Sequence, residues 1–480
     1  MRVCLSRDCL SPQIWGAVTR TTMAQVCRLG LLLALLLPAV GASKPGAVVR
    51  LNKEVLSYVS KVGKGPLQQA LQVTVPYFLE QRGEGLQPTR VQILDVQVPR
   101  LHLYFVDGMG IRLLAAANFT VKVFRVPEPL ELILPVVLLA DAHVAQGSIG
   151  TPVVSISACL LLFDKAIVFD DTHSTPPALL VLVQQHVRAV LRNKVCLSVS
   201  NLVQDLNVHL GTLIGLKPVG PESQIRYFMI NAPNITKNYI SLDINAVLFL
   251  LGKPILLPVN ATPFTLPEQV GTRGAMVTVG LSQDVFDSAL LLLQKAGTLN
   301  LDITGQLKSK DNLLNTSVLG QVIPEVARQF PEPMPVVLKV RLGGTPMVTI
   351  HTNNATVQLS PFIEVLAAAS NSAFHSLFSI NVTVNLSLQL SVSKAKLQGT
   401  LSVLGGIQLT VASSNVGSIE TYKVHALIDA VFEKPLLDHL NALLGIGVAL
   451  PNVVNLNYVT PEVFVQEGYV VISSGLCYQH

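Results

Sequence analysis

The most regular pattern in the chain lies at 380–392, INVTVNLSLQLSV, where apolar and polar residues alternate without a break. Because successive side chains of a β-strand point to opposite faces, this stretch predicts one long strand with a dry face and a wet face. The alternation resumes at 397–403 and again at 407–411, on either side of Gly405-Gly406. A glycine pair between two such runs is typical of a hairpin turn, so we expect these runs to pair with each other.

Helical and strand-like patterns follow one another in the first half of the chain. An amphipathic helix is predicted through Leu51, Val55 and Val59, with a kink at Gly65-Pro66. A second long helix is predicted to begin at Pro176. The predicted strands lie at 91–105, with register slips that suggest bulges, and at 111–124, 130–139, 152–162 and 240–251.

The second half repeats this order. Leu281-Ser-Gln-Asp-Val285-Phe286 has the polarity of Leu51-Asn-Lys-Glu-Val55-Leu56 at an offset of 230 residues, and each predicts the start of a helix, with Ser282 as an N-cap. A helix at 424–444 must be kinked or split at Pro435. Further strands are predicted at 299–307, 335–342, 347–359, 453–459 and 469–473.

These patterns predict an α+β protein with an internal duplication at domain scale. The expected divisions are an N-terminal extension and signal peptide at 1–42, an N-terminal domain at 43–251, a Pro-rich linker at 252–270 and a C-terminal domain at 271–480. The linker is placed where Pro254, Pro258, Pro263 and Pro267 interrupt regular pairing.

The N-terminus predicts secretion. A leucine-rich run at 29–40 follows Arg28 and precedes Gly41-Ala42, as in a secretory signal cleaved near Ala42. Met23 is the expected usual start; the alternative is that the extension is tolerated ahead of the signal. Removing 1–42 leaves 30 basic and 28 acidic residues, a net charge of +2 instead of +5, which gives little attraction for nucleic acid.

Three cysteines remain after cleavage. In an oxidising compartment Cys159 and Cys196 are expected to pair, closing a loop whose chain-entropy stabilisation is about 3 to 4 kcal/mol. Cys477 is left over, either as a tolerated thiol near the end or as an intermolecular link. Seven Asn-x-Ser/Thr sequons are candidate glycosylation sites in a secreted chain, at Asn118, Asn234, Asn260, Asn315, Asn354, Asn381 and Asn385.

The sequence contains no recognisable catalytic or metal-binding motif. The nearest approach to a nucleophile elbow is Gly280-Leu-Ser282-Gln-Asp284, and Ser282 is better explained as a helix cap. The ten histidines are scattered without close pairs. We therefore expect no enzyme, no cofactor and no metal site.

The chain is unusually apolar, with 50% hydrophobic and 13% charged residues, yet beyond the N-terminus no run reaches the length of a spanning helix. Two interpretations remain open. The apolar helix faces either form an ordinary core or, where the sheet is too long for its helices, line an elongated pocket for acyl chains.

Several segments together resemble the lipid-binding family of bactericidal/permeability-increasing protein, lipopolysaccharide-binding protein and the plasma lipid-transfer proteins, and within it the long palate, lung and nasal epithelium group. They extend in order over nearly the whole chain after the signal. The matching segments are Pro45-Gly-Ala-Val-Val-Arg-Leu51, Leu191-Arg-Asn-Lys194, Gly280-Leu-Ser282 with Ala296-Gly297, Ile323-Pro-Glu-Val-Ala-Arg-Gln-Phe330, and Ser414-Asn-Val-Gly417.

The resemblance implies two tandem domains arranged as a boomerang, each a long helix wrapped by a highly twisted antiparallel sheet, with a central sheet joining them. It also implies a phospholipid-sized pocket in each half and a single disulfide, carried onto Cys159 and Cys196. Two departures stand out. The region 111–162 holds only Arg112, Lys122 and Arg125, so tight lipopolysaccharide binding is not expected, and Pro66 interrupts a helix that the family pattern runs further.

We therefore expect a secreted, extracellular, glycosylated lipid-binding protein of mucosal innate defence, with phospholipid or another acyl lipid as partner and lipopolysaccharide as a weaker candidate. A secreted surface-active or protein-interaction scaffold is the alternative. No nucleic acid and no transmembrane segment are expected. Candidate pocket walls are Leu51, Val55 and Val59 in the first half, and Val285, Phe286 and Ala289 in the second.

Overall fold

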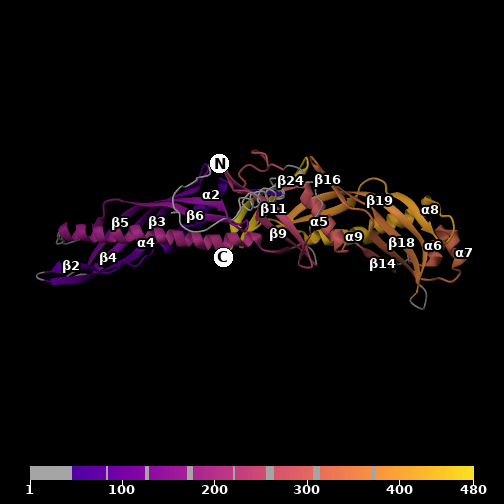
Figure 1. The fold of residues 1–480 in the computed structure, drawn as a ribbon, viewed down its shortest axis with the longest axis horizontal. Helices are drawn as coiled ribbons and strands as arrows, with labels where there is room; N and C mark the ends of the chain where they lie inside the picture. The colour runs from indigo at the N-terminus through magenta and orange to yellow at the C-terminus, as the bar shows by residue number, and fades with distance from the viewer. Residues whose placement is uncertain are drawn as a thin grey trace, which may run out of the picture. The chain divides into compact units, whose positions relative to one another are not determined.

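The computed structural model describes residues 46–82, 85–124, 129–169, 177–219, 222–255, 264–305, 314–368, 373–453 and 455–479 (Figure 1). The predicted signal peptide, Arg125 and the sequon at Asn260 lie outside these residues. We call residues 46–255 the N-terminal half and 264–479 the C-terminal half. The predicted α+β class is confirmed, because long antiparallel sheets and separate helices make up both halves.

The N-terminal half contains a six-stranded antiparallel sheet in the order β2-β3-β4-β5-β6, with β7 added to β5. Its longest strand, β3, pairs with β4 through two register shifts, at Ile93/Asp95 and Gln97/Arg100, so the predicted bulges are present. The bounds are β2 Phe78–Arg82, β3 Gly85–Val106, β4 Gly110–Phe124, β5 Leu130–Gln146, β6 Pro152–Phe163 and β7 Ile167–Phe169.

The long helix α4 (Pro177–Gly211) lies along this sheet and packs against β6 (Figure 1). Its fully buried residues recur every four positions, at Leu179, Val183, Val187, Leu191, Val195 and Val199. Because a helix turns about 100° per residue, each step of four moves the buried stripe about 40° around the axis. The stripe therefore winds around α4, as a sheet with strong twist requires, and Cys159 of β6 is bonded to Cys196 of this helix.

The first predicted helix begins later than expected. Residues Ala47–Asn52 form strand β1, so the expectation that Leu51 opens a helix is wrong. The helix α2 spans Glu54–Val62, and α3 spans Lys64–Ala70 with Pro66 in its first turn. Proline is tolerated there because the amide hydrogens of a first helical turn have no partner inside the helix.

The same correction applies to the repeat in the second half. Leu281 and Ser282 end strand β13 (Val277–Ser282), and helix α5 follows at Gln283–Lys295. Ser282 occupies the N-cap position, but its hydroxyl is buried without a partner, so it does not cap the helix as predicted. Gly297, with φ +71°, follows the C-cap Ala296, the position where glycine commonly stops a helix.

The C-terminal half is built around β19 (Phe374–Ser393), the predicted long strand. The sheet order is β14-β15-β18-β19-β17-β16, and β20 and β21 also pair with β19. The bounds are β14 Leu301–Thr304, β15 Val336–Leu342, β16 Met347–His351, β17 Asn354–Leu359, β18 Pro361–Ala368, β20 Lys396–Val403 and β21 Gln408–Ser414.

The expected hairpin at Gly405-Gly406 is wrong. Strands β20 and β21 each pair with β19, β21 along Phe378–Thr383 and β20 along Leu386–Ser393. The hairpin turn lies instead at Lys394-Ala395, where φ is +47° and +58°, the signs required by a type I′ turn. At Gly405-Gly406 the chain passes from one strand to the next along the same side of β19.

The remaining helices lie mostly in the C-terminal half. The predicted split at Pro435 is confirmed by α8 (Thr421–Glu433) and α9 (Pro435–Ile446). Helices α6 (Thr316–Val322) and α7 (Pro324–Gln329) precede β15, and the 3₁₀ helix η1 (Thr212–Ile214) follows α4. None of the helices in the described ranges combines the length and apolar composition needed to cross a membrane.

A third sheet joins the two halves in the order β23-β24-β13-β1-β11-β9-β8, with β10 and β12 also paired to β11. Strands from both halves meet directly where β1 pairs with β13. The other bounds are β8 Lys217–Pro218, β9 Ser223–Met229, β10 Asn234–Ile235, β11 Tyr239–Leu250, β12 Lys253–Ile255, β22 Val448–Ala449, β23 Leu456–Gln466 and β24 Tyr469–Tyr478. The exposed, free Cys477 lies in β24 opposite Asn457.

The described residues of the region predicted as a linker pack against this sheet. Pro254 lies in β12 and is paired with Phe249, so regular pairing extends past the first of the four prolines. Further along, the buried guanidinium of Arg50 donates hydrogen bonds to the carbonyl oxygens of Leu266 at 2.8 Å and Pro267 at 2.7 Å. These bonds hold the start of the C-terminal half against β1 of the N-terminal half.

Candidate apolar pocket

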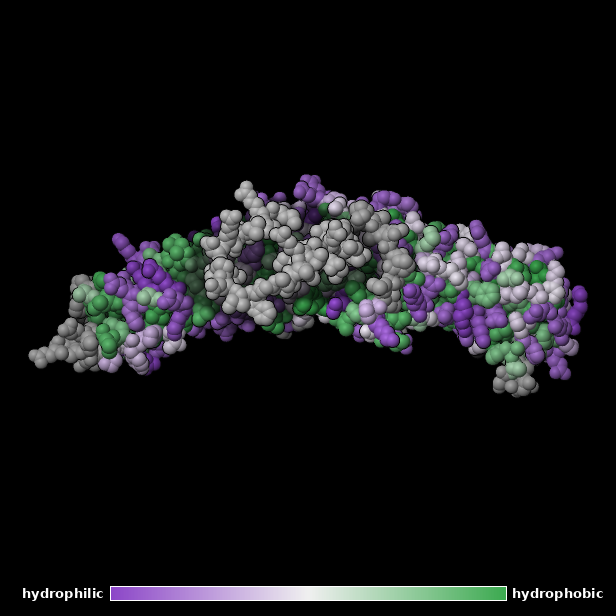
Figure 2. All heavy atoms as spheres, in the orientation of Figure 1, coloured by the Kyte–Doolittle hydropathy of each residue, from purple (hydrophilic) through white to green (hydrophobic). Residues whose placement is uncertain are grey.

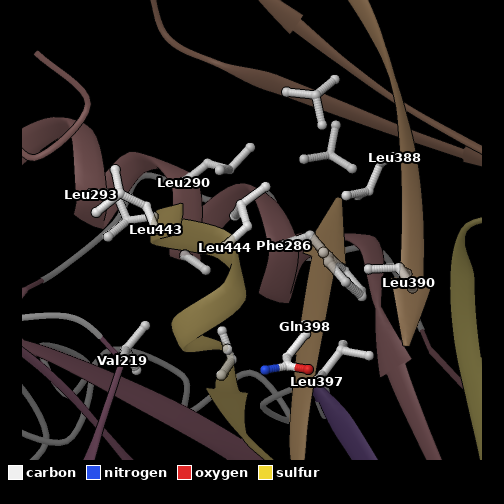
Figure 3. Close-up of a pocket in the computed structure, with 16 residues that line it drawn as sticks. Val219, Phe286, Leu290, Leu293, Leu388, Leu390, Leu397, Gln398, Leu443 and Leu444 are labelled. Atoms are coloured by element: carbon white, nitrogen blue, oxygen red, sulfur yellow. The ribbon is translucent and has the colours of Figure 1, made fainter. Parts of the chain in front are cut away.

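An apolar pocket lies in the C-terminal half between helices α5 and α9 and strands β19 and β20 (Figure 3). The empty space it borders measures about 590 Å³, a figure that includes space open to solvent. Among its sixteen lining residues only Gln398 has a polar side chain. The lining residues are Val219, Phe286, Ala289, Leu290, Leu293, Val348, Val357, Leu388, Leu390, Leu397, Gln398, Gly399, Leu443, Leu444, Gly447 and Val448.

Sequence periodicity explains why these side chains meet. Phe286, Ala289, Leu290 and Leu293 recur at intervals of three, one and three, which places them on one face of α5. Leu388 and Leu390 belong to the dry face of β19 that the alternating pattern predicts. Figure 3 shows the α5 side chains and those of Leu443 and Leu444 from α9 converging on the space that β19 borders.

The polar group at the pocket is already satisfied. Gln398 Nε2 donates a hydrogen bond to the carbonyl oxygen of Gly445 at 2.6 Å. Beside it Gly399 allows Leu388 to pack closely, because a Cβ at this position would come within 2.9 Å of Leu388 Cδ1 and force it to move. The lining therefore offers dispersion contacts and apolar surface, and suits a hydrocarbon chain.

The edges of the strands around the pocket are held by helix side chains. Asp287 Oδ1 of α5 accepts a hydrogen bond from Val348 N at 2.8 Å, and Gln283 Oε1 accepts one from Ile350 N at 3.1 Å. Burial of the Asp287 carboxylate raises its pKa. These contacts bind α5 to β16, the end strand of the sheet order, and so position Phe286 and Ala289.

Two asparagine side chains of other helices also hydrogen-bond to the backbone of strands. Asn441 of α9 accepts from Leu401 N at 2.7 Å and donates to Leu401 O at 3.2 Å. Asn207 of α4 makes the same two bonds with Val154 of β6, at 2.8 and 2.7 Å. The signal that could have identified both is the repeated Leu-Asn-x-x-Leu-Gly at Leu206 and Leu440.

The six pocket candidates from the sequence are not brought together. Phe286 and Ala289 line the pocket, whereas Val285 is not among its lining residues and lies beside Gly46. Leu51 is in β1, and Val55 and Val59 are on α2, with Val59 39% exposed. Sequence reasoning missed the contributions of Val219, β20 and α9, because these segments lie far apart along the chain.

The outer face of the N-terminal half carries exposed apolar side chains. Leu160 and Leu162 of β6 and Ile167 and Phe169 of β7 are each more than half exposed. Figure 2 shows hydrophobic side chains interspersed with hydrophilic ones on the viewed face of this half.

The cations of β4 are neutralised by acidic residues of β5: Arg112 pairs with Asp141, and Lys122 pairs with Glu131 at 2.6 Å. The hydrogen bonds from Arg112 lower the pKa of Asp141.

Six predicted glycosylation sites lie in the described residues. Asn234, Asn354, Asn381 and Asn385 are exposed, the last two on the wet face of β19. Asn118 is partly buried, and Asn315 Oδ1 caps α6 by accepting from Val318 N at 2.7 Å. No group of three or more histidine, cysteine, aspartate or glutamate residues suited to a metal ion occurs within the described ranges.

Comparison with known proteins connects this architecture to one family. The model of the LBP / BPI / CETP family N-terminal domain matches residues 55–206, and the model of its C-terminal domain matches residues 219–478. The chain is 74% identical over 457 residues to "BPI fold-containing family B member 2" of Homo sapiens, covering 95% of this chain and all of that protein.

Other relatives agree. The protein of the same name from Mus musculus is 65% identical over 95% of this chain and its own full length. Among solved structures, that of lipopolysaccharide binding protein matches with a TM-score of 0.58 and 21% identity, covering 91% of this chain and all of that one, which shows a shared fold. The chain therefore belongs to the LBP / BPI / CETP family.

Proposed function

We propose that this is a secreted, non-enzymatic lipid-binding protein that holds phospholipid or another acyl lipid in the pocket of its C-terminal half. The single observation that carries the proposal is the composition of the pocket wall, in which fifteen of sixteen residues are apolar or glycine. Each methylene transferred from water to such a wall stabilises the complex by about 0.8 kcal/mol. The setting we propose is innate defence of mucosal fluids, with the described sequons glycosylated.

The family supports this proposal. A solved relative is named lipopolysaccharide binding protein, and a relative from Sebastes schlegelii is named bactericidal permeability-increasing protein. In this chain Arg112 and Lys122 are held by acidic partners, so we propose an acyl lipid, and not lipopolysaccharide, as the preferred ligand.

Displacement of a fluorescent fatty acid tests the proposal. The purified protein should bind cis-parinaric acid, and phospholipid added with a solubilising carrier should displace it. Replacing Ala289 by Phe fills the pocket from α5 and should weaken binding at least tenfold. Lys295→Phe adds the same ring at an exposed position of the same helix and serves as the control. Equal binding by both variants would contradict the pocket assignment.

The exposed apolar side chains of β6 and β7 favour a second candidate, a surface-active or protein-interaction scaffold. Such a protein would lower the surface tension of water while failing to bind the probe. Replacing Leu160, Leu162, Ile167 and Phe169 by serine should then abolish surface activity. The lipid-binding proposal predicts that these replacements leave probe binding unchanged.

A further inference from the structure

A lysine lies close to the pocket in a setting that is unusual for a structural cation. Lys217, at the start of β8, donates a hydrogen bond from Nζ to the carbonyl oxygen of Asn452 at 2.7 Å. The segment 447–452 that it contacts includes Gly447 and Val448 of the pocket wall. Two tyrosines bind the same segment: the buried Tyr227 donates from Oη to Ala449 O at 2.7 Å, and the partly buried Tyr458 donates from Oη to Pro451 O at 2.6 Å.

Lys217 lies near the pocket wall both along the chain and in space. Val219, two residues further on, lines the pocket, and β8 contacts β22, which carries Val448 of the same wall. Two residues of extended chain span about 7 Å, a distance comparable with the length of the lysine side chain. Figure 3 shows Val219 on the side of the pocket away from Leu390.

The charge of Lys217 has no acidic partner in the described part of the chain. Burial alone lowers its pKa to about 8, with no opposing effect from a nearby carboxylate. A partly buried ammonium group that donates to a single carbonyl keeps unused hydrogen-bonding capacity. Buried charges in proteins are normally paired, so this group lacks an anion.

The fold itself does not require a cation here. Gly215-Leu216-Lys217 follows α4 as Gly447-Val448-Ala449 follows α9, after the two Leu-Asn-x-x-Leu-Gly segments. Both segments lead into short strands, β8 and β22. Where the first half has Lys217, the second has Ala449, which forms its strand without any charge.

We infer that Lys217 binds the anionic headgroup of the lipid, a carboxylate or phosphate, while the acyl chain occupies the pocket beyond Val219. This inference rests on the proposed function and adds a preference for acidic lipids to it. The chemistry requires one negative charge on the group that terminates the hydrocarbon chain.

Two ligands with the same hydrocarbon chain test the inference, using displacement of the neutral probe methyl cis-parinarate at pH 7. Oleic acid should displace the probe from the wild-type protein at a concentration at least tenfold lower than oleyl alcohol. Lys217→Gln removes the charge but can still donate to Asn452 O, and it should make the two ligands equal. Lys217→Arg keeps the charge and should keep the preference.

Each outcome of this displacement experiment either supports or overturns the inference. Displacement by oleyl alcohol in Lys217→Gln at the wild-type concentration shows that the variant pocket is intact; if oleic acid remains preferred there, the inference is overturned. Equal displacement by both ligands in the wild type overturns it without any variant. If neither ligand displaces the probe from the wild type, the proposed function itself fails. Loss of the preference with 10 mM inorganic phosphate would assign the site to free phosphate instead of a lipid headgroup.

Discussion

Val49 of β1 and Val279 of β13 pair directly across the middle of the central sheet, and they are equivalent positions of the two halves. Their separation, 279 − 49 = 230, equals the offset between the repeated segments at Leu51 and Leu281. The neighbours repeat this relation, since Val49 pairs with Leu242 and Val279 pairs with Ile472, and 472 − 242 is again 230. A local two-fold axis therefore passes between the two valines.

This shared sheet predicts that the halves unfold together. Val279→Ala removes two methyl groups from a fully buried position and should lower the free energy of unfolding by about 2 kcal/mol. Hydrogen exchange followed by mass spectrometry should show faster exchange in β5 and in β19 alike. Faster exchange confined to the C-terminal half would contradict the coupling, and Thr352→Ala, in an exposed turn, is the control.

The asparagine contacts predict equal roles for two residues far apart in sequence. Asn441→Ala leaves Leu401 N without its partner and should cost about 1 to 3 kcal/mol of stability, as should Asn207→Ala at Val154. Urea denaturation followed by circular dichroism measures both. Because the sites share no partner, the double variant should show the sum of the two losses. A loss below about 0.5 kcal/mol for either single variant would mean that its two bonds contribute little.

Asp287 predicts a change in stability with pH. Its pKa is raised in the folded protein, so folding favours the protonated form, and the penalty for its charge appears as pH rises through the unfolded pKa toward the folded pKa. Asp287→Asn keeps an acceptor for Val348 N and should be neutral or stabilising at pH 7, and it should remove this part of the pH dependence. Asp287→Ala removes the acceptor and should destabilise by about 1 to 2 kcal/mol.

Melting temperatures of the three proteins from pH 4 to 8 test this. The difference in melting temperature between Asp287→Asn and the wild type should become smaller as the pH falls. A gap that widens toward low pH would show that the carboxylate charge is favourable in the folded state.

The ion pairs of β4 and β5 predict how affinity for lipopolysaccharide can be changed. In the double variant Asp141→Asn, Glu131→Gln, Arg112 and Lys122 lose their acidic partners. Binding to immobilised lipopolysaccharide at low salt should be severalfold tighter than that of the wild type, and it should weaken again at high ionic strength. Unchanged binding would show that neutralisation of these cations does not limit the affinity.

The sequence predicted the parts of this fold that depend on local periodicity. The alternation at 380–392 identified β19, and Pro435 located the division between α8 and α9. Strand pairing was harder to predict, because a glycine pair is a usual hairpin signal, whereas the true turn at Lys394-Ala395 has positive φ at two residues that rarely adopt it. Leu51 was assigned to a helix because a partly buried apolar residue at the end of a strand fits the helical spacing of the residues that follow equally well.

The pocket could be predicted only in part. Phe286 and Ala289 follow from the apolar face of α5, but Val219, 67 residues before Phe286, and Leu443 of α9, 157 residues after it, reach the site only through tertiary contacts. The role of Lys217 could not be predicted from the sequence, where it is an ordinary lysine beside a proline. Only the fold shows that it is partly buried next to Asn452.

The lipid that the protein carries when it is made gives the sharpest test of the proposed pocket. We would purify wild-type protein, Ala289→Phe and Lys295→Phe from eukaryotic culture medium, extract each with organic solvent and quantify lipids by mass spectrometry against a mock purification. We expect about one acyl lipid per chain in the wild type and in Lys295→Phe, and far less in Ala289→Phe. Lipid no higher than the mock in the wild type, or equal lipid in all three proteins, would show that the pocket does not hold the ligand.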